Sequence, residues 1–269
     1  MTAYIGRLFY LGTDYYGSQL QPGFTTIQGE LIRGVEEWSK ESHDTRTVQL
    51  AGRTDRGVHS LGQIVLIRTE KKLDIDRINS YLPDDIVLWA SVPVDEDFNP
   101  RFDVLMRHYR YYLCPMSSNL NLRAMQLALD AAIGLHDFHV LSKPDGTRPT
   151  TATILNASLM SHSNILKIDL FGTNFLWKLV RKIISLLVQV GEGQFDSDII
   201  TKIIRRQNEM PSGIAPAPPE SLVLVETITP IRMKQSKYAL RRLRKNLDRM
   251  IYSLQRTHTT LSALIDDFL

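Results

Sequence analysis

The sequence predicts an α+β protein made of two ferredoxin-like halves followed by a C-terminal helical extension. The hydrophobic pattern gives the order β-α-β-β-α-β up to about residue 104, and a similar succession of elements follows up to residue 230. After residue 231, leucines recur at alternating spacings of three and four, which is typical of an a/d helical seam. We therefore expect three regions, residues 1–104, 105–230 and 231–269.

The first half begins with a strand-like run from Tyr4 to Leu11, which the turn residues 12–17 end. The run Thr25 to Gln28 has the pattern of a capping box and predicts a helix with Ile27 and Leu31 on its apolar face. The remaining elements are expected to be strands at 47–51, 63–68 and 87–94 and a short helix at 74–82.

The second half contains a long apolar helix that is expected to lie deep in the structure. It is predicted over residues 174–190, and Arg181 on its flank needs an acidic partner if it is buried there. Because two similar halves meet, we expect a binding cleft between them. The other elements are predicted as strands at 109–114, 151–161, 165–170 and 222–228 and helices at 122–133 and 197–206.

Composition favours a globular cytoplasmic protein. The chain is 43% hydrophobic and 23% charged, and we expect neither a secretory signal nor a membrane span. Its single cysteine, Cys114, excludes an internal disulfide and any multi-cysteine zinc site. His136 and His139 have a spacing that metal sites use, but no suitable further ligands stand beside them, so we expect no metal and no cofactor.

Positive charge is concentrated in the tail. Residues 231–269 hold nine Lys or Arg against three Asp, which gives +6 and leaves −3 for the rest of the chain. Such a tail suggests a polyanionic partner, although a solvated helix face would carry the same residues. Its leucine seam is expected to pack on the body or on a second subunit.

The segment from Ala51 to Ser60 combines glycines, arginines and one carboxylate between two strands. As an ordinary loop, it would use Asp55 to stabilise a turn. A phosphate-binding P-loop is excluded because the Gly-Lys-Ser/Thr ending is missing. In a third interpretation, Asp55 is a reactive carboxylate that the neighbouring Arg53 and Arg56 keep ionised.

Six ordered motifs between Tyr4 and Ile228 resemble those of the tRNA pseudouridine synthase A family. The most specific is Gly-Arg-Thr-Asp-x-Gly-Val-His at 52–59. The others are the turn 12–17, Asn-x-x-Leu-Pro-x-Asp-Ile at 79–86, the Phe/Arg/Tyr-rich run 98–111, the Leu-Val-Arg helix around 181 and the strand 222–225. The chain departs from the family at Ser18, where an aromatic residue is usual, and at Arg56, where a small one is.

The resemblance implies a pseudouridine synthase fold with one mixed, mainly antiparallel sheet shared by the two halves. It also implies a homodimer and a tRNA substrate modified in the anticodon stem-loop at positions 38 to 40. Asp55 would then be the catalytic carboxylate, Tyr109 the surface on which the target base stacks and Arg181 the partner of Asp55. Arg53 would help to extrude the base, and Leu222 and Leu224 would complete the substrate site. The residues expected to contact RNA are Arg56, Arg101, Phe98, Phe102 and Arg148.

The chemistry fits these residue types. Pseudouridine forms when the C1′–N1 bond breaks, the uracil rotates and C1′ bonds to C5, so the nucleotide must first leave its stack. Asp55 could attack C1′ or remove the C2′ proton, and Tyr109 is a candidate base for the C5 proton. The competing hypotheses are an RNA-binding protein of the same fold that has lost activity, and a glycoside or nucleoside hydrolase, which normally needs two facing carboxylates.

Overall fold

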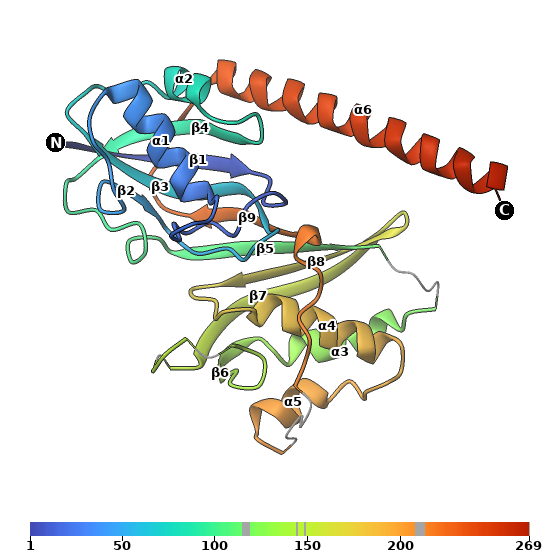
Figure 1. Ribbon diagram of the computed structural model, residues 1–269. Helices are drawn as coiled ribbons and strands as arrows, with labels where there is room; N and C mark the ends of the chain where they lie inside the picture. The colour runs from blue at the N-terminus through green and yellow to red at the C-terminus, as the bar shows by residue number, and fades with distance from the viewer. Residues whose placement is uncertain (115–118, 144, 148, 208–212, 269) are drawn as a thin grey trace.

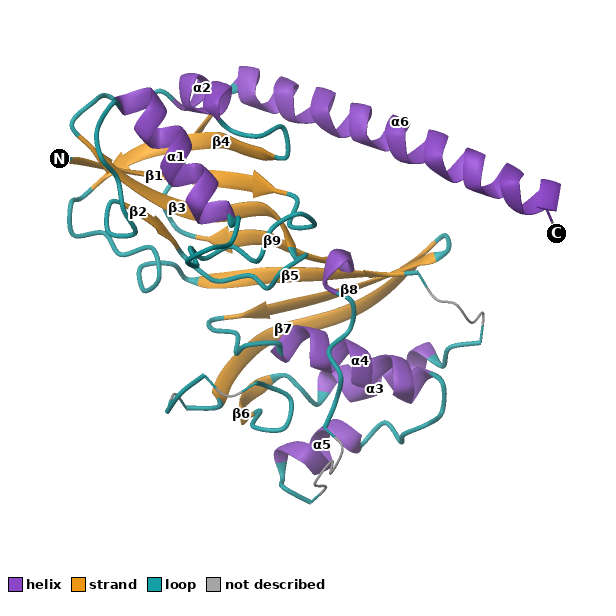
Figure 2. Ribbon diagram, viewed as in Figure 1, coloured by secondary structure: helices purple, strands orange, loops and turns teal. Residues whose placement is uncertain are grey.

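The computed structural model describes residues 1–114, 119–143, 145–147, 149–207 and 213–268 (Figure 1). A single large sheet runs through the molecule, with most helices packed against one side and a long C-terminal helix projecting from one end (Figure 2). Among the described residues, no helix is both long and apolar enough to cross a membrane.

The first half contains four strands and two helices in the predicted order. Its elements are β1 (Thr2–Tyr10), α1 (Ile27–Ser39), β2 (Val48–Leu50), β3 (His59–Thr69), α2 (Ile75–Ile78), the 3-10 turn η1 (Asn79–Tyr81) and β4 (Ile86–Val94). The Thr26 hydroxyl accepts a hydrogen bond from the Gly29 backbone, so α1 is capped by Thr26, one residue later than a capping box over 25–28 would place the cap.

The second half has a similar succession of elements. They are β5 (Met106–Leu113), α3 (Leu122–Asp130), β6 (Gly134–Asp137), β7 (Thr151–His162), β8 (Ile165–Gly172), α4 (Leu179–Gly191), α5 (Ile199–Ile204), η2 (Pro219–Ser221) and β9 (Leu222–Ile228). The short strands β6 and β10 (Lys234–Gln235) were not predicted, because runs of two to four residues carry almost no periodic signal.

The strands form one sheet in the order β10-β4-β1-β3-β9-β5-β8-β7-β6, with β2 beside β3. The predicted α+β class with a mixed, mainly antiparallel sheet is confirmed, since β3 and β9 pair in parallel and the other described pairings are antiparallel. Both halves repeat one order: β4-β1-β3-β2 in the first and β9-β5-β8-β7 in the second.

The parallel contact between β3 and β9 joins the two halves. His59 lies opposite Val223 and Ser60 opposite Leu224, and the Ser60 hydroxyl donates to the Leu224 carbonyl at 3.0 Å. The loop that leads into β3 is thereby held beside the start of β9, at the boundary where a shared site was expected.

Separate hydrophobic cores stabilise the two halves. In β1, Leu8 and Tyr10 face a core shared with α1, whereas Ala3 and Ile5 face the opposite core, where Phe98 is buried. This alternation follows from the two-residue period of a strand. In the second half, α3, α4 and α5 pack on β5, β7, β8 and β9 around a core that includes Tyr109 and Leu224.

Helix α4 begins five residues later than predicted. Asn174 instead binds the neighbouring strand, since its side chain accepts from Thr153 N at 3.2 Å and donates to Thr151 O at 3.1 Å. Lys178, immediately before the helix, has a left-handed φ of 66°. Tertiary hydrogen bonds from Asn174 to β7 therefore prevail over the helical pattern at residues 174–178.

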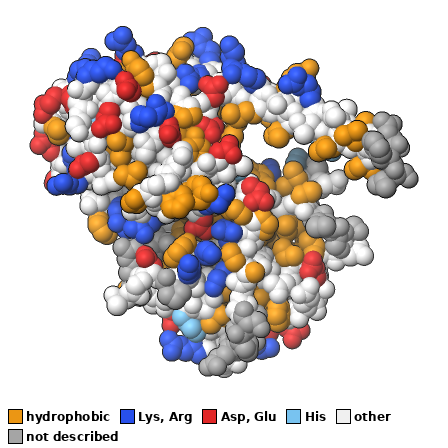
Figure 3. All heavy atoms as spheres, viewed as in Figure 1, with side chains coloured by type: hydrophobic (Ala, Val, Ile, Leu, Met, Phe, Trp, Pro, Cys, Tyr) orange, Lys and Arg blue, Asp and Glu red, His pale blue; other side chains and the backbone are white. Residues whose placement is uncertain are grey.

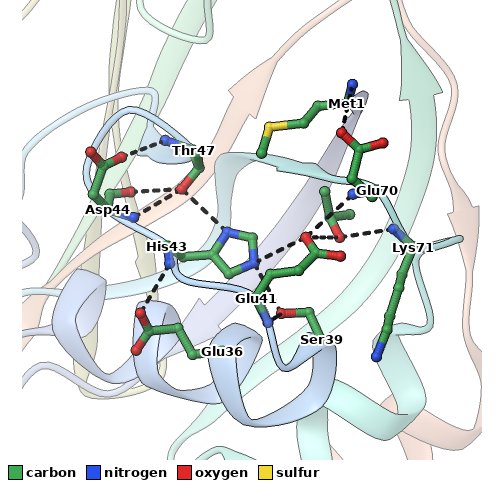
Figure 4. Close-up of polar contacts among 10 residues, drawn as sticks. Met1, Glu36, Ser39, Glu41, His43, Asp44, Thr47, Glu70 and Lys71 are labelled. Atoms are coloured by element: carbon green, nitrogen blue, oxygen red, sulfur yellow. Dashed lines mark hydrogen bonds and ion pairs between the residues drawn. The ribbon is translucent and has the colours of Figure 1, made fainter.

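His43 ties the C-terminal end of α1 to the segment before β2 (Figure 4). Its ring is within 3.0 Å of the Ser39 hydroxyl and 3.2 Å of the Thr47 hydroxyl, and its backbone N–H donates to Glu36. Burial lowers the pKa of His43, so the folded state favours the neutral ring.

The tail forms one helix, α6 (Lys237–Phe268), whose first part packs on the body. Ala239, Leu243 and Asn246 are buried, and Asn246 donates to Asp84 O at 2.8 Å. Arg249 forms an ion pair with Asp84 at 3.0 Å. The predicted packing of the seam on the body thus holds for the start of the helix, while its distal half extends away from the sheet (Figure 1).

Candidate active site

The loop between β2 and β3 is shaped by close backbone contacts with the turn after β1. A Cβ on Gly12 would lie 2.1 Å from the Val58 carbonyl oxygen, and Gly57 has φ of +84°, so glycine is required at both positions. The Gly57 N–H donates to the Gly12 carbonyl at 3.0 Å. The loop is therefore fixed before any ligand binds.

His59 fixes the other end of this loop. Its Nδ1 accepts from the Gly12 N–H at 3.0 Å, and its Nε2 donates to the Glu220 carbonyl at 2.9 Å. These two bonds require the neutral tautomer, and burial lowers the pKa of His59 in the same sense. The histidine of the motif thus links the loop to η2 in the second half of the chain.

Asp55 and Arg181 meet across the junction of the two halves. Arg181 Nη1 lies 2.8 Å from Asp55 Oδ2, and the side chains are 12% and 20% exposed respectively. Arg181 Nε also donates to the Ala217 carbonyl at 2.6 Å, which orients the guanidinium. Asp55 is therefore the acidic partner that was expected for Arg181, and 20% of the Asp55 side chain remains exposed.

Tyr109 lies in the wall of the same cleft. It is 7% exposed, and its ring makes an edge contact with Phe175 at a centroid distance of 5.0 Å. Burial raises the pKa of Tyr109, so the phenol keeps its proton. A neutral phenol is a poor proton acceptor, and this environment favours the stacking role over the role of a base.

The cleft has a volume of about 1680 Å³ and contains most of the predicted site residues. Those that line it are Asp55, Tyr109, Arg181, Arg53, Leu222, Arg56, Arg101 and Phe102. Phe98 and Leu224 do not line it, since they are 8% and 1% exposed within the cores of the two halves. Arg148 lies outside the described residues.

Cations outnumber carboxylates around the cleft. Six Lys or Arg side chains line it against three Asp or Glu, although the body as a whole carries excess negative charge. Figure 3 shows Lys or Arg side chains near the middle of this face of the molecule. Such an arrangement attracts a polyanion. The cations are Arg53, Arg56, Arg101, Arg107, Lys178 and Arg181.

Ser18 and Arg107 support the site in ways that were not predicted. Ser18 is fully buried, its hydroxyl accepts from Thr54 N at 2.8 Å, and its own N–H donates to Thr54 O at 3.1 Å. Arg107 donates to the carbonyls of Ala51 at 2.8 Å and Thr173 at 2.7 Å. The departure from the family's aromatic residue at position 18 marked Ser18, but only the structure gives its partner.

Comparison with known proteins gives the family. A tRNA pseudouridine synthase A of Methanosarcina acetivorans is 37% identical over 222 residues, which are 81% of this chain and 81% of that protein. The chain belongs to the tRNA pseudouridine synthase A family. A member from Pyrococcus furiosus is 31% identical over 98% of this chain and 96% of its own length. The family model described as tRNA pseudouridine synthase matches residues 128–230, which include Arg181.

Membership in the tRNA pseudouridine synthase A family confirms the resemblance on which the residue roles were based. Synthases of this kind are isomerases, because pseudouridine has the same atoms as uridine. Asp55 lies outside the range of the family model, and its assignment therefore depends on the motif at 52–59 and on the contact with Arg181.

Proposed function

We propose that this chain isomerises uridine to pseudouridine in the anticodon stem-loop of tRNA, at positions 38 to 40, with Asp55 as the catalytic carboxylate. The observation that carries the proposal is the Asp55–Arg181 ion pair, 2.8 Å long, in a cleft lined by cations and by Tyr109. The Asp55 side chain is 20% exposed, so its carboxylate can reach a sugar carbon, while Arg181 holds Oδ2.

Binding depends first on the phosphate backbone. The cleft-lining arginines neutralise phosphates near the target nucleotide, and release of counterions from the RNA favours this contact. Arg53 and Arg56 are exposed on either side of Asp55. We assign to Arg53 the extrusion of the base and to Arg56, Arg101 and Phe102 contacts with the surrounding RNA, with Arg148 as a further contact.

The everted uracil stacks on Tyr109, with Leu222 completing the apolar wall of the pocket. Asp55 either attacks C1′ or takes the C2′ proton, and both routes break the C1′–N1 bond. In the first route the bond between Asp55 and C1′ breaks as C5 bonds to C1′, and in the second the proton returns to C2′. The uracil then rotates and C1′ bonds to C5. C5 loses its proton and N1 gains one, so that no atom enters or leaves overall and no cofactor is required.

We further propose that residues 1–104 and 105–230 are two ferredoxin-like halves and that the enzyme is a homodimer. The repeated strand order β4-β1-β3-β2 and β9-β5-β8-β7 supports the division into halves, because this is the order that β-α-β-β-α-β units adopt. Family resemblance is the basis for the homodimer.

The decisive experiment incubates the purified full chain with tRNA transcripts and maps pseudouridine by carbodiimide-stop sequencing. We expect stops within positions 38 to 40 with the unaltered chain, no product with Asp55→Ala, and similar tRNA binding by both proteins. Product from Asp55→Ala would remove Asp55 from catalysis. Tight tRNA binding without product from the unaltered chain would favour the inactive RNA-binding protein, and stops elsewhere would change the target positions.

A further inference from the structure

The distal half of α6 exposes large apolar side chains to solvent. Residues 251–266 are all exposed, whereas Ala239, Leu243 and Asn246 near the start of the helix are buried. Figure 3 shows hydrophobic side chains along this projecting part of the helix. The large apolar side chains concerned are Ile251, Tyr252, Leu254, Leu261, Leu264 and Ile265, with exposures between 45% and 69%.

Most of these side chains share one face of the helix. Leu254, Leu261 and Leu264 occupy successive a and d positions, with Ile251 and Ile265 alongside, while Tyr252 lies on the opposite side. Thr257 fills the remaining d position, and its hydroxyl donates to the Ser253 carbonyl at 3.2 Å. This face can therefore be buried without leaving the Thr257 hydroxyl unpaired.

Charge along α6 separates this face from the RNA-binding cleft. Residues 237–249 contain six Lys or Arg and one Asp, whereas residues 250–269 contain only Arg256 against Asp266 and Asp267. The basic character of the tail thus belongs to the part that packs on the body. A projecting half with a net charge of −1 and an apolar stripe suits a protein surface and not a polyanion.

We propose that the distal half of α6 pairs with the same segment of a second copy of this chain, as an antiparallel two-helix seam. The charge distribution selects both the partner and the direction. In an antiparallel pair, the acidic end of each helix approaches the basic segment of the other, whereas a parallel pair would place the acidic ends together.

The heptad positions define the register of the seam. Positions a and d face each other when Leu254 lies opposite Leu264 of the partner subunit and Thr257 opposite Leu261 of the partner subunit. The two-fold axis then passes near residue 259. This arrangement specifies which surface mediates dimerisation, and it is independent of the reaction assigned to Asp55.

Sedimentation velocity of the full chain tests the seam. The unaltered chain should sediment as a dimer, and the triple variant Leu254→Ser, Leu261→Ser, Leu264→Ser as a monomer with an unchanged near-UV spectrum of the body. Tyr252→Ser, the matched control on the opposite face, should remain dimeric. A monomeric unaltered chain, or a triple variant that stays dimeric, would overturn the proposal, and so would loss of tRNA affinity without any change in mass.

Cross-linking tests the direction without removing the seam. In a Cys114→Ser background, the double variant Leu254→Cys, Leu264→Cys should form covalent dimers with a short bismaleimide, because each cysteine faces the other type across the interface. Leu254→Cys alone should not, since its two copies would lie about 15 Å apart along the axis at 1.5 Å per residue. Efficient cross-linking of Leu254→Cys alone would indicate a parallel pair and contradict the proposal.

Discussion

Replacing Arg181 should reveal how strongly the two halves are coupled at the active site. Its guanidinium donates to Asp55 at 2.8 Å and to the Ala217 carbonyl at 2.6 Å. A hydrogen bond to a charged group contributes about 1.5–3 kcal/mol, and breaking a buried ion pair costs about 3–5 kcal/mol. Because 20% of the Asp55 side chain is exposed, we expect Arg181→Ala to lower the free energy of unfolding by about 2–3 kcal/mol.

A double-mutant cycle isolates the contribution of the pair. Urea denaturation of the unaltered chain, Asp55→Ala, Arg181→Ala and the double variant should give a coupling energy of about 1.5–3 kcal/mol. The Ala217 bond is lost in both Arg181 variants and therefore cancels from the coupling. A coupling energy below about 0.5 kcal/mol would refute the view that this ion pair joins the halves.

Activity of Arg181→Lys separates charge from geometry. Lysine keeps the positive charge but cannot donate to Asp55 and Ala217 from one planar group. Single-turnover pseudouridine formation should fall about 100-fold, which corresponds to about 2.7 kcal/mol of transition-state stabilisation. An unchanged rate would mean that only the charge of residue 181 matters.

Three further predictions concern single side chains. Tyr109→Phe should retain most of the single-turnover rate, whereas Tyr109→Ala should lose the stacking contribution of about 1–3 kcal/mol; equal losses would instead assign an essential function to the hydroxyl. The pKa of His43 is lowered on folding, so below about pH 6.5 the unfolded chain binds the extra proton more readily than the folded chain. The free energy of unfolding therefore decreases as the pH is lowered. In urea denaturation between pH 7.5 and 5, the unfolding free energy of His43→Gln should depend less on pH than that of the unaltered chain, and the remaining dependence should come from His59. The same pH dependence in both proteins would contradict the lowered pKa of His43. Ser18→Ala leaves the buried Thr54 N–H without its acceptor and should cost about 1–3 kcal/mol of unfolding free energy, with an unaltered urea midpoint as the contrary result.

The sequence predicted the contact between Asp55 and Arg181 better than it predicted the structure around them. Asp55 and Arg181 were identified by short motifs, and their contact follows from the chemistry of a charged residue on an apolar helix. The position of Phe98 could not be predicted in this way, because a motif records residue type and not the side of a loop that faces the core. The start of α4 was missed since the bonds of Asn174 to β7 are tertiary and leave no periodic trace.

The tail illustrates a different limit. Leucine spacing predicted one amphipathic helix, and the charge count gave residues 231–269 a net charge of +6, but neither quantity tells where the helix leaves the body. That point is fixed by Asn246 and Arg249, which bind Asp84 in the loop before β4. Before this point the heptad side chains pack on the body of the same chain. Beyond it, they are exposed and available to a second chain.

The parallel pairing of β3 with β9 explains how Asp55 and Arg181 come together from the two halves of the chain. Asp55 and Arg181 are separated by 126 residues, and no local structure could hold them 2.8 Å apart. Two contacts across the junction and one within the second half fix their positions. The first two are the register of Ser60 with Leu224 and the bond of His59 to Glu220, and the third is the bond of Arg181 to Ala217. Each links a residue beside the catalytic loop, or the arginine itself, to the segment 217–224. Since that segment contacts both the loop and the arginine, its placement sets the distance between the Asp55 carboxylate and the Arg181 guanidinium, and a change in the segment should alter that distance.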